Sequence, residues 1–346
     1  HTANNTIIDF INKLSLSNIF KHQLGITHTA SDGQKYQVSV DSLLANYSFK
    51  YFGKDKGVSV YTFVDDKHSL FYSTVISASE REAAYVIDGL LHNDVTRSNI
   101  HSTDTHGFAE SIFAASHFIG TSFAPRFKNF SNQYIYAFSA RQTYVNKGYK
   151  ILPSRTINST LLRQNWDDVL RFMTTIKLKE TSASILFKRL SSYAKDHPLH
   201  KAIKEFGRII KTQFILTYID DVELRQRIEK QLNRVELSNK FSKAVFFDKN
   251  SEFTVSTREE QEIVTACKTL IQNAIILWNY LFLSQRLINT RNSQDKSALH
   301  NTIKNGSLMT WQHVNMRGEY DFTKAANNSN FDMTKILSLK VENMAV

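Results

Sequence analysis

The amino-acid sequence predicts a mixed α/β fold with flanking helices, interrupted by an all-helical insertion. Strand-like and helix-like patterns alternate over the first 140 residues, in an order typical of a mixed sheet. From about residue 158 to 216 only helical patterns occur, and two long helical patterns follow. With 346 residues, of which 42% are hydrophobic, the chain is long enough to bury a sizeable core.

β-rich composition and turn residues predict the strands. Asp32-Gly33 lies within residues 23–40, between β-rich flanks, as at a strand end or hairpin. A turn is expected at Asp65, Asp66 and Lys67. The further expected strands are residues 58–64, 70–76, 100–103 and 134–138.

Apolar residues at helical spacing predict the helices. Ser79 followed by Glu82 is a capping-box pattern, which marks the start of one of them. The expected helices are residues 5–22, 79–91, 107–119, 221–247 and 258–288. The predicted organisation is a helical lead-in (1–22), a first core part (23–140), the insertion (141–220), a second core part (221–300) and a C-terminal segment (301–346) with a poorly ordered tail.

The charge balance favours a polyanionic partner. The chain has 43 Lys and Arg against 32 Asp and Glu, a net charge of +11. Nucleic acid fits this excess best and an anionic membrane second, although a soluble basic protein without such a partner also fits. The longest apolar run is far shorter than the ~20 residues of a membrane span, and a membrane partner is not expected. A single cysteine, Cys267, excludes an internal disulfide framework and is expected in the core.

Two aspartates are ambiguous when each is taken alone. Asp32 precedes a glycine, and Asp-Gly is most often a plain turn. Asp104 precedes a predicted helix, where an N-capping role is the default.

Glu236 is more informative than either aspartate. It continues a stripe of apolar residues spaced by four, namely Leu224, Ile228 and Leu232. A carboxylate at the end of a core-facing stripe needs a cation, because burying it unpaired costs several kcal/mol. A surface pair with Lys240, four residues on, explains the pattern equally well.

Taken together, the three acids fit a ribonuclease H-like active site. Two aspartates at strand ends and a glutamate on a later helix are separated by the helical insertion. Carboxylate oxygens bind hard divalent cations, and two such ions about 3.5–4 Å apart can catalyse an in-line phosphoryl displacement. The sequence has no His or Cys cluster with zinc spacing and no phosphate-binding loop of the Walker type, so ATP use is not expected.

Several segments resemble signatures of the Tn-three family of transposases. The longest is Ser102–Arg126, which reads STDTHGFAESIFAASHFIGTSFAPR and contains Asp104. The others are Ser31–Gln34, Asn233–Phe247, Leu277–Leu281 and Trp311–Tyr320. These segments occur in the order of the family and extend over about residues 15–322.

The resemblance implies a DDE active site on a ribonuclease H-like fold. Its catalytic and metal-binding acids fall on Asp32, Asp104 and Glu236. The implied cofactor is two Mg²⁺ ions, for which Mn²⁺ substitutes. One departure is Val235, where the family commonly has glycine.

The implied reaction is nicking of transposon 3′ ends, followed by strand transfer of the 3′-hydroxyl into target DNA with a replicative outcome. The implied partners are transposon-end DNA and target DNA, with a homodimer in the full-length protein and a location in the bacterial cytoplasm at the nucleoid. Family members are longer, and the chain starts at His1, so we expect it to be a catalytic fragment.

Further residues are weaker candidates for DNA contacts. Arg126 and Lys128 could hold the backbone, but ordinary surface cations fit almost as well. His106 could orient a nucleophile or phosphate, or cap a helix. Two alternative functions stay open at this point: a ribonuclease H-like nuclease without strand transfer, and an inactive DNA-binding remnant.

Overall fold

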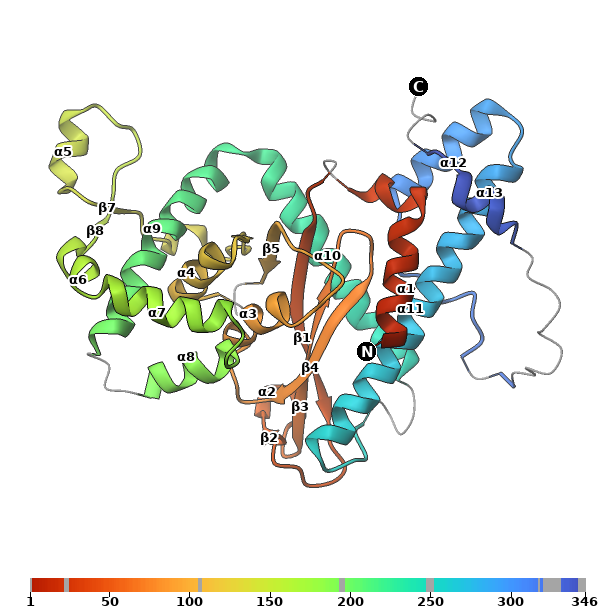
Figure 1. The fold of residues 1–346 in the computed structure, drawn as a ribbon, viewed down its shortest axis with the longest axis horizontal. Helices are drawn as coiled ribbons and strands as arrows, with labels where there is room; N and C mark the ends of the chain where they lie inside the picture. The colour runs from red at the N-terminus through yellow and green to blue at the C-terminus, as the bar shows by residue number, and fades with distance from the viewer. Residues whose placement is uncertain are drawn as a thin grey trace.

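The computed structural model describes residues 2–21, 25–104, 108–192, 197–246, 252–316, 318–319 and 331–341. A curled mixed sheet lies in the middle of the molecule, with helices on both of its faces (Figure 1). The predicted α/β class with a ribonuclease H-like mixed sheet is confirmed. None of the described helices combines the length and apolar character needed to cross a bilayer.

The main sheet is built on β1 (His28–Gln37) and β3 (Lys56–Val64), which pair antiparallel. β4 (Leu70–Ser77) pairs antiparallel with β3. On the other edge of β1, β5 (Ile100–Thr103) pairs in parallel, so its carboxyl end lies beside the middle of β1. Two short strands extend this sheet. β6 (Ser122–Phe123) pairs in parallel with β5, and β2 (Asn46–Tyr47) pairs antiparallel with the start of β3.

Helices cover both faces of this sheet, and β3 is therefore buried along almost its whole length. On one face α3 (Ala83–Leu91) and α4 (Glu110–Ile119) pack with Phe63 in one hydrophobic core. On the other face Val64 packs with α1 (Thr2–Lys13), α10 (Val222–Val245) and α11 (Arg258–Asn289) in a second core. The sheet thus lies between these two clusters, and a third, smaller one forms around Val58, Val60 and Val75.

A layer of helices lies to the left of the sheet in Figure 1. Its members are α5 (Arg141–Asn146), α6 (Ser159–Gln164), α7 (Trp166–Lys177), α8 (Ala183–Ser192) and α9 (Pro198–Asp220). α9 approaches α4 at Gly207, where a Cβ would collide with the backbone carbonyl of Glu110. Glycine therefore permits the close approach that joins this layer to the core.

The remaining elements are short or lie at the right of Figure 1. They are η1 (Ser15–Phe20), α2 (Phe49–Phe52), η3 (Phe130–Asn132), β7 (Tyr136–Ala137), β8 (Arg155–Thr156), α12 (Ser293–Asn305) and α13 (Met333–Ser338). β7 and β8 form a two-stranded parallel sheet of their own.

The strands predicted over 58–64, 70–76 and 100–103 are confirmed as β3, β4 and β5. The long helices predicted over 221–247 and 258–288 are confirmed within two residues at each end, as α10 and α11. Long periodic segments were predictable because their packing faces repeat over many turns.

Other predictions are wrong in instructive ways. The strand expected over 134–138 is reduced to Tyr136–Ala137 and pairs with β8 outside the main sheet. The helix expected from Ser79 starts at Ala83, and Ser79 instead bonds to Asn46, so the capping box does not form. Cys267 is exposed because it lies on the outer side of α11.

The helix expected over 5–22 is divided into α1 and the 3₁₀ helix η1. The one expected over 107–119 starts at Glu110, and Thr105 to Gly107 lie outside the described residues. Part of the tail expected to be poorly ordered forms α13, whose Ile336 is buried.

Candidate active site

Asp32 lies in the middle of a strand, not in a turn. It pairs with Thr62, and Gly33 pairs with Tyr61, across the β1–β3 ladder. The prediction of a hairpin at Asp32-Gly33 is therefore wrong, because the chain connects β1 to β3 farther on, through β2 and α2. A Cβ added at Gly33 would meet the end of the Glu82 side chain, which shows how close this carboxylate lies to β1.

Asp104 follows β5 directly and lies level with Asp32. The parallel register places Ser31 opposite Thr103, so the residue after β5 comes beside Asp32. The capping role considered for Asp104 falls on Thr105 to Gly107, which lie outside the described residues; the next described helix, α4, starts at Glu110 with Ala109 at its N-cap. The fold thus brings together two acids that are distant in the sequence.

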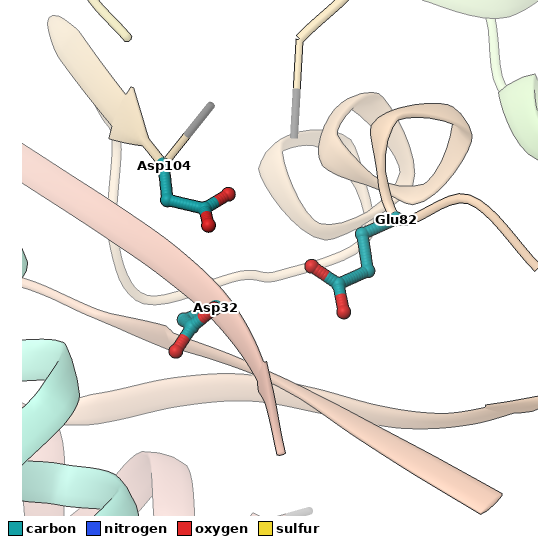
Figure 2. Close-up of side chains that lie close together, drawn as sticks. All are labelled: Asp32, Glu82 and Asp104. Atoms are coloured by element: carbon teal, nitrogen blue, oxygen red, sulfur yellow. The ribbon is translucent and has the colours of Figure 1, made fainter. Parts of the chain in front are cut away.

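A third carboxylate, Glu82, completes a compact acidic cluster that we call the carboxylate cluster. One carboxylate oxygen from each of Asp32, Glu82 and Asp104 lies within 4.8 Å of the other two. Figure 2 shows the three groups facing a common space, from β1, from the end of β5 and from the segment before α3. All three side chains are partly buried.

Sequence reasoning missed Glu82, because it assigned this residue to a capping box. A glutamate beside a helix start carries no sequence signal for metal binding. Only the packing of Glu82 against Gly33 reveals the approach to Asp32.

Glu236 lies outside the carboxylate cluster. Its side chain is 55% exposed, and Val235 takes the buried position at 0% exposure. The expectation that Glu236 faces the core is wrong. A helix has 3.6 residues per turn, so a stripe spaced by four turns about 40° at each step and leaves the core.

Arg126 is the ion-pair partner of Glu236 on this surface. Its Nη2 lies 3.9 Å from Glu236 Oε1, and its Nη1 donates to Glu229 Oε2 at 3.1 Å. The backbone N–H of Arg126 donates to Thr103 O at 2.9 Å, which anchors it beside β5. The surface pair considered with Lys240 is thus replaced by one with Arg126, adjacent to Asp104.

The carboxylate cluster strongly concentrates negative charge. Burial, then the charge of Asp104, raises the pKa of Asp32 to about 6. Burial, then the charge of Asp32, raises the pKa of Glu82 to about 7. Glu236 adds to the rise in the pKa of Asp32, and is therefore electrostatically close to it. A bound divalent cation would relieve this repulsion.

A buried polar network fixes β1 against β5. His101 bonds to Thr29 Oγ1 at 2.8 Å and to Ser31 Oγ at 2.9 Å, and Ser31 bonds to the Tyr61 hydroxyl at 2.6 Å. Burial lowers the pKa of His101 to about 3, so its ring stays neutral. The network therefore adds no positive charge below the cluster.

Hydrogen bonds also fix α10 against β1. Asn239 Nδ2 donates to Asp32 Oδ2 at 2.8 Å, and Gln34 Nε2 donates to Asn239 O at 3.0 Å. Tyr36 and Ser242 bond at 2.7 Å one turn farther along. The helix that contains Glu236 is thus held in register with the strand that contains Asp32.

The donor set suits a hard divalent cation. Its ligand atoms are carboxylate oxygens, without nitrogen or sulfur, as Mg²⁺ and Mn²⁺ prefer. Of the weaker candidates, Lys128 is exposed near Arg126 in the sequence, and His106 lies outside the described residues.

The family model of the Tn3 transposase DDE domain matches residues 1–320. The chain belongs to this family. It is 36% identical over 300 residues to the transposase for transposon Tn1546 of Enterococcus faecium, which covers 86% of this chain and 30% of that protein. It is 33% identical over 298 residues to the transposase for transposon Tn501 of Pseudomonas aeruginosa, covering 85% of this chain and 30% of that protein.

A third relative is the transposase for transposon Tn21 of Escherichia coli, 30% identical over 301 residues, with 87% of this chain and 30% of that protein covered. The chain therefore spans about 30% of the length of these Tn3-family relatives. Family membership implies a divalent metal, and the carboxylate cluster of this DDE domain fits one.

We predict that the metal-free DDE domain loses stability as the pH rises. The folded-state pKa values of Asp32 and Glu82, about 6 and about 7, exceed the ordinary values of 3.8 and 4.5. The folded state binds protons at these two carboxylates more tightly than the unfolded state does. The stability gained from this protonation is therefore fully present below pH ~4 and is lost as the pH rises through ~6 and ~7. Glu82→Gln should therefore raise the melting temperature by a few degrees at pH ~8 in chelator, and less at pH ~5.

The control is Asp9→Asn, which changes an exposed carboxylate in the middle of α1. The measurement is the melting temperature of both variants and of the wild type at pH ~8 and at pH ~5. Equal melting temperatures for Glu82→Gln and Asp9→Asn at pH ~8 would contradict the account of charge repulsion.

Proposed function

We propose that this DDE domain binds two Mg²⁺ ions, or Mn²⁺ in their place, to nick transposon 3′ ends and transfer the 3′-hydroxyl into target DNA. The observation that supports this best is the convergence of Asp32, Glu82 and Asp104 within 4.8 Å. Membership of the DDE family supports the same chemistry. Carboxylates around metal ions need no nucleotide cofactor for an in-line displacement, so ATP is not required.

Asp32, on β1, and Asp104, directly after the neighbouring β5, would hold the metal ions through their carboxylate oxygens. When bound, the ions activate the attacking oxygen and stabilise the leaving oxygen. The chain's own contribution is to keep the two carboxylates level through the β1–β5 register. Asn239 orients the Asp32 carboxylate through its hydrogen bond.

Glu82 would supply a further carboxylate from the opposite side of β1. Its carboxylate lies against Gly33, in the space that a Cβ would occupy. Lys35 lowers the pKa of Glu82 through its positive charge, although burial dominates the shift. Glu82 thus combines the proximity and the negative charge that a ligand needs.

Glu236 would complete the metal site once its side chain leaves Arg126. The contact between them is long, 3.9 Å, and half exposed, so little free energy opposes the change. Arg126 would then exchange Glu236 for a DNA phosphate beside Asp104 while its Nη1 stays bonded to Glu229, with Lys128 and His106 as further contacts. This exchange couples DNA binding to completion of the acidic site.

The wider setting follows from the family and the net charge of +11. The partners would be transposon-end DNA and target DNA, with a homodimer in the longer protein. The location would be the bacterial cytoplasm at the nucleoid.

We predict that Asp32→Asn, Asp104→Asn and Glu236→Gln each reduce strand transfer by roughly 100-fold or more, because each removes a ligand oxygen of the reacting metal ions. The assay joins labelled transposon-end duplex with a free 3′-hydroxyl to a plasmid in Mg²⁺ or Mn²⁺. The matched control is Glu229→Gln, because Glu229 lies on α10 and also pairs with Arg126.

Full activity in any of the three variants would contradict the site. If the wild type cuts but does not join, the domain is a nuclease of the ribonuclease H-like class. If neither the domain nor the longer protein cuts or joins, and the domain binds no Mn²⁺, it is an inactive remnant.

We further predict that Glu82→Gln weakens Mn²⁺ binding about tenfold or more, as expected for loss of a carboxylate ligand. Isothermal titration with Mn²⁺ measures this without reference to activity. Glu80→Gln is the matched control, two residues away and paired with Lys188 outside the cluster. Equal Mn²⁺ affinity for Glu82→Gln and Glu80→Gln would remove Glu82 from the metal site.

A further inference from the structure

A basic pocket lies at the far end of β1 from the acids. It is a cavity of about 330 Å³ between β1, β5, α10, α12 and the end of η1. Its charged lining consists of Lys21, Arg227, Lys230, Arg234, Lys304 and Asp66. Figure 1 shows α10, the main wall, passing behind β1. The fold therefore gathers cations from three separate elements around one cavity.

The base of this pocket is preorganised. Arg234 is only 8% exposed, and its Nη1 donates to Gln231 Oε1 at 2.6 Å. Gln231 in turn donates through Nε2 to Val64 O at 3.1 Å, at the end of β3. A guanidinium held in this way presents its remaining donors in a fixed geometry.

The pocket has more positive charge than its own acids offset. Asp66 is the acid among the described residues that line it, and it is buried with Oδ1 lacking a hydrogen-bond partner. Arg227 is partly neutralised by Asp221 at 3.6 Å. Burial, then the charges of Arg234 and Lys304, lowers the pKa of Lys230. An anion would relieve this mutual repulsion.

We propose that this basic pocket binds a phosphate group of the DNA backbone. Several oxygens of one phosphate can accept from the Arg234 fork and from the ammonium groups of Lys230 and Lys304. Both lysines are exposed, so a backbone that runs along the surface can reach them.

The assignment to DNA rests on the proposed function. His28 lines the pocket and lies four residues before Asp32 on β1, which is about 13 Å along a strand. That span is close to the width of the DNA major groove, about 12 Å. One duplex can therefore contact the pocket and the carboxylate cluster together.

The test measures DNA binding of the whole chain by fluorescence anisotropy, with a mixed-sequence duplex in EDTA over a range of salt concentrations. The double variant Lys230→Gln/Lys304→Gln should reduce the slope of log K against log salt by about 2 and weaken binding roughly tenfold or more at ~0.1 M salt. The matched control is Lys54→Gln/Lys177→Gln, which changes two exposed lysines away from the pocket. An unchanged slope in the double variant, equal to that of the control, overturns the proposal.

A second variant tests the same pocket by a gain of affinity. Asp66→Asn removes the negative charge that opposes an anion, and should tighten DNA binding several-fold. Equal or weaker binding by the folded variant contradicts the proposal. Because EDTA removes divalent metal, these comparisons between variants do not require metal at the carboxylate cluster, and a failed strand-transfer assay leaves them unchanged.

Inorganic phosphate distinguishes the two sources of the anion. If millimolar phosphate raises the melting temperature of the wild type but not of Lys230→Gln/Lys304→Gln, and the DNA slope is unaffected, the pocket takes a free phosphate and the DNA assignment is wrong. If the DNA slope changes as expected, the backbone is the ligand.

Discussion

The parallel pairing of β1 with β5 is the constraint on which the candidate active site depends. It places Asp104 beside Asp32, although 71 residues separate them in the chain. The polar network around His101 fixes this register, since each of its partners is buried between the two strands. A slip of one residue would turn Asp32 to the other face of the sheet and disperse the carboxylate cluster.

The same constraint explains why the cluster needs a cation. β5 ends at Thr103, so from Asp32 onward the edge of β1 is open to side chains from both faces. Asp104 and Glu82 enter this space, and α10 closes it through Asn239. Burial, with the repulsion between these neighbouring carboxylates as the second cause, raises the pKa values of Asp32 and Glu82.

The sequence predicted the long helices and the central strands, because their periodic patterns extend over many residues. The flanking family signatures identified Asp32 and Asp104 as candidate site residues. Each residue taken alone favoured another role, a turn for Asp32 and a helix N-cap for Asp104. The Asp-Gly turn signal depends only on two neighbouring residues, whereas the pairing of Asp32 with Thr62 and of Gly33 with Tyr61 depends on a strand that is distant in the sequence. The spacing of four left Glu236 open between a core position and a surface ion pair, and the drift of the helix turns it outward. Glu82 could not be predicted, because its role depends on contact with Gly33 across the fold.

The central claim is that divalent metal binds between Asp32, Glu82 and Asp104. Anomalous diffraction from crystals of the domain soaked in Mn²⁺ tests it most directly. The account predicts an anomalous peak in direct contact with carboxylate oxygens of Asp32 and Asp104, with Glu82 beside it. Absence of a peak at these residues, with Mn²⁺ bound elsewhere on the domain, would contradict the account.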